Sequence, residues 1–226
     1  MKLAIVVPVL NEAATLALKL QALAPLRARG AELIVVDGGS TDGTPAIAQA
    51  LADQALQAPR GRASQLNAGA AATRADVLLF LHADTQLPAD ADHLIEQALQ
   101  RGHRWGRFDV RIEGRHPLLP VVAWLMNQRS RLTGIATGDQ AVFVQRRLFE
   151  SVGGFAAMPL MEDIELSRRL RAIERPACLR ERVSTSGRRW DQHGFWRTVL
   201  LMWRLRAAHA LGTDAHMLAL RYGYQP

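Results

Sequence analysis

The stretch ELIVVDGGSTDGT, residues 32–44, joins a β-branched apolar run to a segment of turn-forming residues. The run is typical of a strand that is covered on both faces in a parallel sheet. Asp37 ends it, and Thr41 or Asp42 in the following turn can cap the next helix. The stretch therefore predicts a strand, a loop and a helix start, with a carboxylate at the carboxyl end of the strand.

The same pattern recurs on both sides of this stretch. Residues 3–7 form an apolar run that ends at Pro8, and residues 76–81 form another that ends at His82-Ala83-Asp84. Helical segments are expected at about 13–29, from 44 to about 53, and in a short alanine-rich piece before residue 76. Strands that alternate with helices predict right-handed crossovers and an α/β sheet, whose functional loops lie at the carboxyl ends of the strands.

The second half of the sequence changes character. Strands are expected at 107–112 and 140–144, and helices at 118–132, 162–173 and from 195 onward. The helix at 162–173 has acids at its start and arginines at its end, the order that suits the helix dipole. We expect one catalytic domain over residues 1–190, followed by a helical tail over residues 191–226.

Composition limits the chain to one main core. With 226 residues and 49% hydrophobic content, it is long enough for one catalytic-size domain and a small appendage. The single cysteine, Cys178, leaves no disulfide framework within the chain and predicts a cytoplasmic location. Arg197, Arg204 and Arg206 interrupt the most apolar late segment, so no membrane-spanning helix is expected.

The net charge of +7 comes almost wholly from arginine, because Lys2 and Lys19 are the only lysines. The planar guanidinium suits phosphate oxygens. Such an excess indicates nucleic acid, an anionic membrane surface or a phosphorylated ligand, and charge alone does not choose among them. Nucleic acid is not expected as a partner, because the arginines lie on predicted helices without interleaved exposed aromatics.

Two carboxylates stand at the ends of apolar runs. Asp37 and Asp84 are expected at the carboxyl ends of neighbouring strands, where both would face one crevice. One carboxylate could bond the base or ribose of a nucleotide, and the other could hold Mn²⁺ or Mg²⁺ on its diphosphate. Taken singly, each is more simply a turn aspartate. The neighbouring motifs decide between these interpretations.

Five short segments, in this order along the chain, resemble those of the family-2 glycosyltransferases with the GT-A fold. They are Pro8-Val9-Leu10-Asn11-Glu12, Asp37-Gly38-Gly39-Ser40-Thr41-Asp42-Gly43-Thr44, Asn67-Ala68-Gly69, His82-Ala83-Asp84 and Glu162-Asp163. The match covers roughly the first 170 residues. It implies a mostly parallel central sheet flanked by helices, and transfer of a sugar from a nucleotide-diphosphate donor to an acceptor that the sequence does not identify.

The resemblance also implies a donor site and a metal. Asp37 would bond the base, with the turn from Pro8 to Glu12 beside it, and Asp84 would bind Mn²⁺ or Mg²⁺. The donor-binding candidates are Pro8, Asn11, Glu12, Asp37, Gly39, Arg60, Arg62, Gln65, Asn67, His82 and Asp84. His82 stands where most members have an acid, and neutral imidazole is a poor magnesium ligand. A protein that binds the nucleotide sugar without catalysis is therefore the alternative function.

The loop at residues 60–65 places two guanidiniums among small residues, which suits an anion as well as a solvated basic loop. Together with two later segments it resembles a bacterial subgroup of the family. The three segments are Gly61-Arg62-Ala63-Ser64-Gln65, Gly138-Asp139-Gln140 and Arg188-Arg189-Trp190. In this comparison Gly138, Asp139, Gln140 and Trp190 are the acceptor-binding candidates.

Glu162 and Asp163 are the catalytic candidates, with Asp163 as general base in an inverting displacement. A helix N-terminus favours the ionised carboxylate that a base needs. Without the family resemblance, both would be ordinary first-turn acids. His193 is a candidate additional metal ligand, although surface histidines are more common.

An oxidoreductase or a methyltransferase would also use an α/β sheet, but both need a glycine-rich turn after the first strand. That turn is Pro8-Val9-Leu10-Asn11-Glu12 and contains no glycine. We therefore do not expect either activity.

The tail predicts an amphipathic helix, with Trp196, Val199, Leu200, Trp203 and Ala207 on one face. With the basic residues around it, this face suits an anionic membrane surface, which would place the protein peripherally on the inner membrane. Apolar helix faces more often pack on their own domain or on a second subunit, so a homodimer is the other partner considered.

Overall fold

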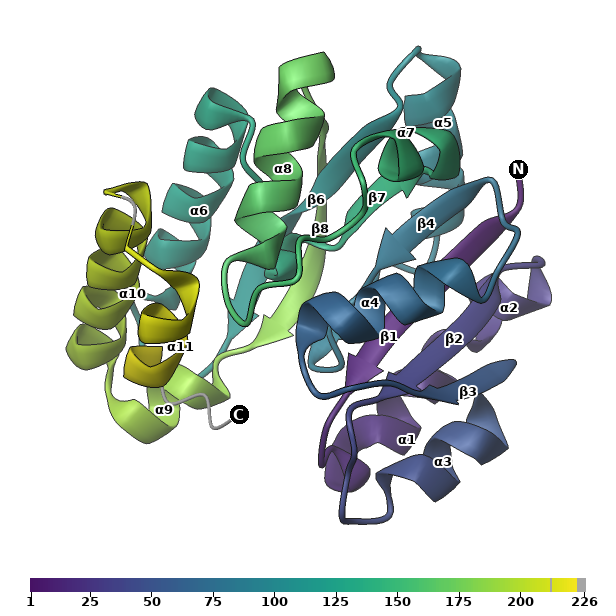
Figure 1. The fold of residues 1–226 in the computed structure, drawn as a ribbon, viewed down its shortest axis with the longest axis horizontal. Coiled ribbons are helices and arrows are strands. Elements are labelled where there is room, and N and C mark those ends of the chain that lie inside the picture. The colour runs from purple at the N-terminus through teal and green to yellow at the C-terminus, as the bar shows by residue number, and fades with distance from the viewer. Residues whose placement is uncertain (212, 223–226) are drawn as a thin grey trace.

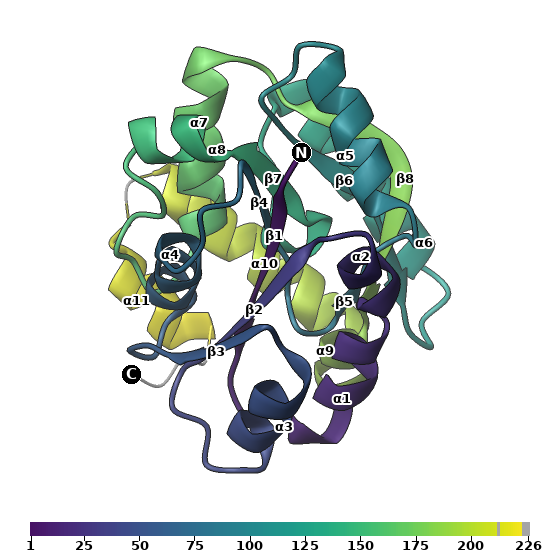
Figure 2. The same cartoon turned by 90° about the vertical axis from the view of Figure 1, so that its right-hand side faces the viewer.

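A computed structural model describes residues 1–211 and 213–222 of the chain. They form an 8-stranded sheet in the order β3-β2-β1-β4-β7-β6-β8-β5, with helices on both faces (Figure 1, Figure 2). The strands are β1 (Leu3–Val9), β2 (Glu32–Asp37), β3 (Gln54–Gln57), β4 (Val77–Phe80), β5 (Thr85–Gln86), β6 (Trp105–Glu113), β7 (Val142–Gln145) and β8 (Ala177–Ser186).

The helices flank this sheet and form the tail. They are α1 (Ala13–Gln21), α2 (Ala24–Ala28), α3 (Thr44–Leu51), α4 (Arg62–Ala71), α5 (Ala91–Gln100), α6 (Leu119–Thr133), α7 (Arg146–Ser151), α8 (Glu162–Ile173), α9 (Arg188–His193), α10 (Phe195–Ala210) and α11 (Ala215–Tyr222), with a short 3-10 helix, η1 (Gly138–Gln140). The predicted α/β architecture is confirmed.

The sheet has a parallel half and a mixed half. Strands β3, β2, β1 and β4 run parallel, as the apolar runs in the first half of the sequence predict. Strand β7 pairs antiparallel with both β4 and β6, β6 pairs parallel with β8, and β5 adds an antiparallel edge. The predicted mostly parallel sheet is thus confirmed, and its antiparallel pairs all involve β5 or β7.

Strands β1 and β2 are buried on both faces, which explains their continuous apolar sequences. Leu3, Ile5 and Val7 belong to a core on one face of the sheet, and Ala4 and Val6 belong to a core on the other face. Alternate side chains of a strand point to opposite faces, so each strand contributes to both cores. The carboxyl ends of these strands are therefore fixed from both sides, and Val9 lies opposite Asp37 in the register.

The helix expected at 13–29 is two helices, α1 and α2. Pro25 lies in the first turn of α2. Proline has no backbone N–H to continue a helix but is well suited to the first turn of one. The first helix therefore ends at Gln21, and a new helix begins at Ala24.

The tail packs on the chain segment that leads into α8. Leu205 of α10 and Leu218 of α11 form a small core with Leu160 and Met161. The expected boundary at residue 190 falls inside α9, and the last four residues of the expected tail lie outside the described part of the chain. The tail helices are thus in contact with the loop that positions Glu162 and Asp163.

The predicted apolar face of α10 is largely exposed. Trp196, Leu200 and Trp203 remain open to solvent, whereas Phe195 and Leu205 are buried. Packing on the domain therefore uses a different side of the helix from the one that the sequence pattern singles out. None of the helices within the described residues has the length and apolar character needed to cross a membrane.

Candidate functional site

The loops after β1 and β2 are tied together at the carboxyl edge of the sheet. Asn11 adopts a positive φ of 53°. Its backbone N–H donates to the Ser40 hydroxyl at 2.8 Å, and its side-chain oxygen accepts the Thr41 N–H at 2.8 Å. Glu12 donates its N–H to the Thr44 hydroxyl at 2.8 Å. The first two motifs of the sequence thus form one interlocked pair of loops.

Asp37 is buried in this pair of loops. One carboxylate oxygen accepts the N–H groups of Gly39 and Ser40, both at 2.9 Å, and the other accepts the Ser40 hydroxyl. Gly39 has a φ of 90°, which glycine adopts at little cost. The structure therefore places Asp37 and Gly39 at the carboxyl end of β2, with the carboxylate oriented by its own loop, and their contact with the donor nucleotide stays a prediction.

Gln65 and Asn67 support the loops through backbone contacts. The Gln65 amide is buried and donates to the carbonyls of Val9 and Val36 at 2.9 and 2.8 Å. Asn67 donates to the Phe155 carbonyl at 2.9 Å and accepts the Phe155 N–H at 3.0 Å. These hydrogen bonds give both side chains a supporting role in the loops, and their contact with the donor stays a prediction.

His82 follows β4 and lies against Gly138. Its Nδ1 is 3.3 Å from an Asp139 carboxylate oxygen, and a Cβ built on Gly138 would come within 2.1 Å of its Nε2. Burial lowers the pKa of His82, but the hydrogen bond to Asp139 and the charges of Asp139 and Asp84 outweigh burial and raise this pKa above its ordinary value. An imidazole that is protonated on both nitrogens has no lone pair for a metal ion, so binding of a proton and binding of a metal at His82 would compete.

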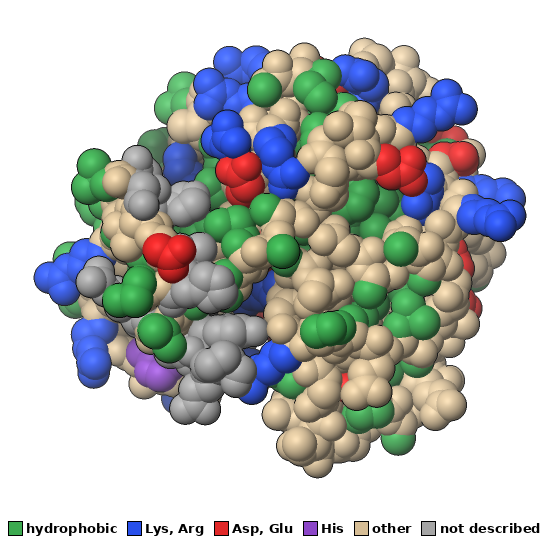
Figure 3. All heavy atoms as spheres, in the orientation of Figure 1, with side chains coloured by type: hydrophobic (Ala, Val, Ile, Leu, Met, Phe, Trp, Pro, Cys, Tyr) green, Lys and Arg blue, Asp and Glu red, His purple; other side chains and the backbone are tan. Residues whose placement is uncertain are grey.

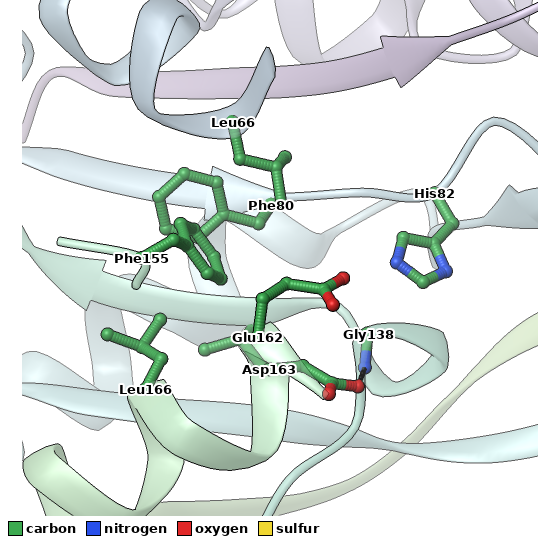
Figure 4. A pocket seen from close by; sticks show the side chains of 9 residues that line it. Leu66, Phe80, His82, Gly138, Phe155, Glu162, Asp163 and Leu166 are labelled. Atoms are coloured by element: carbon green, nitrogen blue, oxygen red, sulfur yellow. Dashed lines mark hydrogen bonds between the residues drawn. The ribbon is translucent and has the colours of Figure 1, made fainter. Parts of the chain in front are cut away.

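Glu162 and Asp163 begin α8 and point toward Gly138 and His82 across a pocket (Figure 4). An Asp163 carboxylate oxygen accepts the Gly138 N–H at 2.7 Å, and the other accepts the Ile164 N–H at 2.7 Å. Each carboxylate oxygen has two lone pairs, so both oxygens retain an acceptor position for a substrate proton. The helix start thus aims Asp163 into the pocket, as the sequence predicts.

Glu162 is almost fully buried beside Asp163. Burial, followed by the charge of Asp163, raises the pKa of Glu162 above its ordinary value. The Arg62 guanidinium, at the first residue of α4, lies 4.0 Å from Glu162. The structure therefore brings part of the arginine loop to the predicted catalytic pair, while Arg60 lies exposed at the start of that loop.

The residues that carry positive φ mark the same region. Within the described residues, the non-glycine positions with positive φ are Asn11, Ala141 and Met161. Asn11 follows β1, Ala141 follows η1 and Met161 precedes α8, so each lies in or beside a predicted motif. Residues other than glycine adopt this conformation at a cost, which is often found where a functional group must be aimed.

The later motifs occupy different environments. Gln140 is fully buried, and its amide oxygen accepts the N–H of Thr137, so it shapes η1 from within. Trp190 packs against Phe195 with ring centroids 5.7 Å apart. Arg188 lies 3.4 Å from Glu12, which brings the last motif to the first across 176 residues of sequence. Pro8 is buried within β1 and shapes the turn from inside the sheet.

The residues suit a metal that is held mainly by substrate oxygens. Asp84 is half-buried just after β4, and within the described part of the chain no three His, Cys, Asp or Glu side chains gather as a metal cage. His193 is exposed at the end of α9. Because Mg²⁺ is often bound by one or two carboxylates and substrate phosphates, a single aspartate fits such an ion.

Two arginines beside the catalytic pair were not predicted. Arg129 of α6 and Arg206 of α10 both lie near the charges of Asp163 and Asp139. Arg206 entered the sequence interpretation as a break in an apolar segment and as a basic residue beside the predicted membrane-facing helix face, not as part of the site. Arg129 lies in an ordinary helical pattern with no motif around it, so no sequence signal marked it.

Comparison with known proteins identifies the family. The sequence model described as glycosyl transferase family 2 matches residues 4–152. The chain belongs to this family. The match includes the loops that carry Asp37 and Asp84 and ends before Glu162, so a catalytic role for Glu162 and Asp163 stays a prediction from the motif resemblance.

Curated proteins that resemble this member of the family include synthases of a glycolipid. The chain is 26% identical over 215 residues to a beta-monoglucosyldiacylglycerol synthase of Nostoc sp., covering 80% of this chain and 46% of the relative. A synthase of the same name from Synechocystis sp. is 26% identical over 195 residues, covering 73% and 40%. The chain thus spans about half the length of the curated relatives that it matches.

Solved structures share the fold. A mannosyltransferase from Pyrobaculum calidifontis, in complex with GDP-Man and Mn²⁺, matches with a TM-score of 0.66 at 20% identity, over 93% of this chain and 61% of that one. S. aureus TarS with UDP-GlcNAc gives 0.66 at 15%, over 82% and 58%. Glucosyl-3-phosphoglycerate synthase from Mycobacterium tuberculosis, with Mn²⁺, UDP and phosphoglyceric acid, gives 0.61 at 22%, over 81% and 69%. The predicted GT-A fold is confirmed.

Proposed function

We propose that this chain transfers a sugar from a nucleotide-diphosphate donor to an acceptor hydroxyl, with inversion at the anomeric carbon. The observation that carries this proposal is the meeting of Asp163 with the Gly138–His82 pair at the carboxyl edge of the sheet (Figure 4). Ligands of open α/β sheets bind outside the carboxyl ends of the strands. Membership of the family supports a nucleotide sugar as the ligand.

In this proposal the first half of the sheet binds the donor. Asp37 contacts the base or ribose from the end of β2, and Asp84 would hold Mn²⁺ or Mg²⁺. When bound, the metal would supply positive charge against the departing diphosphate. Arg62 reaches the same region from the first residue of α4, and its guanidinium suits phosphate oxygens.

Asp163 acts as the general base. The acceptor oxygen attacks the anomeric carbon, the bond from that carbon to the diphosphate oxygen breaks, and the hydroxyl proton passes to Asp163. The Gly138 N–H and the start of α8 fix the carboxylate for this step. Burial and the charge of Asp163 both raise the pKa of Glu162, so the site disfavours a second negative charge beside Asp163.

The alternative is a protein of the same fold that binds the nucleotide sugar without turning it over. His82 favours this alternative, because a histidine paired with Asp139 stands at the position where most members of the family have an acid. Release of nucleoside diphosphate in the presence of Mn²⁺ separates the two functions, since a binding protein leaves the donor intact.

We also propose that α10 touches an anionic membrane surface from the cytoplasmic side. Its exposed Trp196, Leu200 and Trp203 lie among exposed basic residues, including Arg197 and Arg204. Hydrophobic and basic side chains lie close together over the tail in Figure 3, at the left of the view. Apolar burial combined with attraction to anionic headgroups is the mode of binding of interfacial helices. A second copy of the chain is the other occupant that a test must separate.

A thermal-shift screen of UDP- and GDP-sugars with Mn²⁺ or Mg²⁺ tests the donor proposal. A ligand that binds only the folded state raises the melting temperature, by an amount that corresponds to about 2.7 kcal/mol at a hundredfold excess over the dissociation constant. We expect a shift that needs both nucleotide and metal. No shift with any nucleotide would contradict the proposal.

A further inference from the structure

Arg129 has an unsatisfied guanidinium next to the catalytic pair. Its Nε and Nη2 atoms are out of contact with solvent and have no hydrogen-bond partner among the described residues. A buried donor without an acceptor costs about 1–3 kcal/mol, and more when it is charged. Arg107, also buried, is different, because its guanidinium is bonded to Asp109, to Ser130 and to the Asn127 carbonyl.

The Nε and Nη2 atoms of Arg129 form the edge of the guanidinium that can donate two parallel hydrogen bonds to one oxyanion. In other arginines of this protein the same edge donates to a carboxylate. Arg29 donates to Asp92 at 2.7 and 2.8 Å, and Arg168 donates to Glu165 through two hydrogen bonds of 2.9 Å each. Such bidentate contacts suit carboxylates and phosphates. On Arg129 this edge is formed, buried and without an oxyanion.

The position of Arg129 is fixed by its neighbours on α6. Asn127 pairs with both the N–H and the carbonyl of Val110 in β6, at 2.9 and 3.0 Å. Ser130 is fully buried and accepts a hydrogen bond from Arg107. The helix is thus clamped to the sheet on one side, and the guanidinium of Arg129 is presented from a rigid element.

A second guanidinium, that of Arg206 on α10, adds to the positive charge. Burial, followed by the charge of Arg206, lowers the pKa of Arg129 to about 10, so Arg129 still carries its charge at neutral pH. Burial likewise lowers the pKa of Arg206. Two like charges in a partly buried site favour the entry of an anion between them.

Arg129 and Arg206 lie on helices α6 and α10, which stand on the opposite side of α8 from α4, the helix that begins at Arg62 (Figure 1). The charges of Asp163 and Asp139 act on both arginines. The charge of Arg62 acts on Asp139 as well, and also on Glu162 and His82. A group bound by Arg129 and Arg206 therefore lies close to the proposed base, on the side of α8 that is left to the acceptor when Arg62 binds the donor.

We propose that Arg129 and Arg206 bind a phosphate group carried by the acceptor, and so place its hydroxyl at Asp163. The inference rests on the proposed function, since it assigns the acceptor to the same pocket. It gives the acceptor a chemical class, a phosphate ester with a nearby hydroxyl. Both a small soluble phosphate and an anionic phospholipid have this chemistry.

Calorimetric titration with glycerol 3-phosphate tests the site, with R129Q and R206Q as variants. We expect each variant to weaken binding by about tenfold or more, because each loses a charged donor. R129K keeps the charge but lacks the two-point edge, so it should recover only part of the affinity. The matched control is R101Q, which removes the same charge from an exposed position at the end of α5.

A stability measurement guards against a merely structural role. Replacing an unpaired buried charge with an apolar side chain should raise stability, so R129M should melt above the wild type without phosphate. Added glycerol 3-phosphate should raise the melting temperature of the wild type and leave that of R129M unchanged. A lower melting temperature for R129M, with an unchanged phosphate response, would overturn the proposal.

Nucleoside diphosphate binding separates this inference from the proposed function. R129Q should bind the nucleotide within about twofold of wild type; a loss of about tenfold would assign Arg129 to the donor and overturn the acceptor site alone. If no nucleotide binds at all, the proposed function fails while the phosphate titration still reports on Arg129.

Vesicles distinguish the source of the phosphate. Binding to phosphatidic acid vesicles that falls in R129Q but not in R101Q would support a lipid acceptor, and dependence on Arg129 with glycerol 3-phosphate alone would support a soluble one. Dependence on Arg129 in neither assay would overturn the proposal.

Discussion

The two halves of the sheet differ in the polar groups near the proposed site. In the parallel half, the buried Asp37 and Gln65 and the half-buried Asn67 are all bonded to backbone groups of their own or neighbouring loops. In the mixed half, most buried polar groups are also bonded, but two donor atoms of Arg129 have no partner among the described residues, and Glu162 is buried with a raised pKa. A ligand with an oxyanion would satisfy the donors of Arg129, whereas Asp37, Gln65 and Asn67 already have partners within the fold.

This difference distinguishes the loops that form a binding surface from the pocket in which the reaction is proposed to take place. A loop whose polar groups are satisfied within the fold offers a preformed surface to a donor. A pocket with unpaired charge costs stability and becomes favourable when substrate enters. Substitutions in the first half should therefore affect stability and binding, and those in the second half should affect turnover.

The largest effect is expected at Asp163. D163N keeps the size and the hydrogen bond from Gly138 but cannot accept the acceptor proton, so turnover should fall by about a hundredfold or more. Donor binding should stay near that of wild type. Wild-type turnover in D163N would exclude Asp163 as the base and would contradict the assignment of the chemistry to the second half of the sheet.

In the parallel half, Gln65 should act through stability. Q65L leaves the buried carbonyls of Val9 and Val36 without their side-chain donor, which should lower the free energy of unfolding by about 2 kcal/mol. Urea unfolding measures it. Gln49 on α3 is exposed, so Q49L should change stability little. Equal stability of the two variants would mean that Gln65 does not hold these loops together.

Asp84 should act on binding with metal present. D84A removes the carboxylate that would share the metal with the diphosphate, so nucleotide affinity in Mn²⁺ should fall by about tenfold or more. The melting temperature should change little. Unchanged affinity in calorimetry would exclude Asp84 as the ligand.

Membrane binding by the tail should depend on charge and on the exposed apolar face. R197Q and R204Q should each weaken binding to anionic vesicles by about fivefold, corresponding to about 1 kcal/mol per basic residue. W203A should weaken it as well, without changing the oligomeric state. Absence of vesicle binding at low salt, together with a dimer that W203A dissociates, would assign this face to a second copy.

The smallest expected effect is a pH-dependent contribution of Asp53, at the edge of the parallel half, to the free energy of unfolding. Asp53 bonds Arg27 and the Leu33 N–H, and the hydrogen bond with Arg27 lowers the pKa of Asp53 below its usual value. The stabilisation is present above the unfolded pKa of about 3.9 and is lost as pH falls through the lower folded value. D53N should cost about 0.5 kcal/mol at pH 7, and this cost should shrink in acid. A cost that does not change with pH would exclude the ion pair.

The sequence predicts the elements whose burial is uniform. Strands β1, β2 and β4 have continuous apolar runs because both faces are covered, and their ends carry Asp37 and His82 where expected. Strand β3 reads Gln-Ala-Leu-Gln, and β5 has only two residues, so periodicity does not mark either strand. Edge strands of this kind take their conformation from their neighbours.

The site was predictable where chemistry lies in a local motif. Asp163 follows from its helix start and from the motif resemblance. The support roles of Gln65 and Asn67 were not predictable, because their partners are backbone groups of loops far away in sequence. Arg129 was missed for the same reason, since its surroundings come from α8, η1 and α10.

Calorimetric titration of the wild type, D37A and D163N with nucleoside diphosphate and with the nucleotide sugar tests the division between binding and chemistry most directly. D37A should weaken both ligands alike, by about tenfold, because Asp37 contacts the nucleoside common to both. D163N should bind both within about twofold of the wild type. If D37A weakens only the sugar-bearing ligand, or if D163N loses the nucleotide, the account is contradicted.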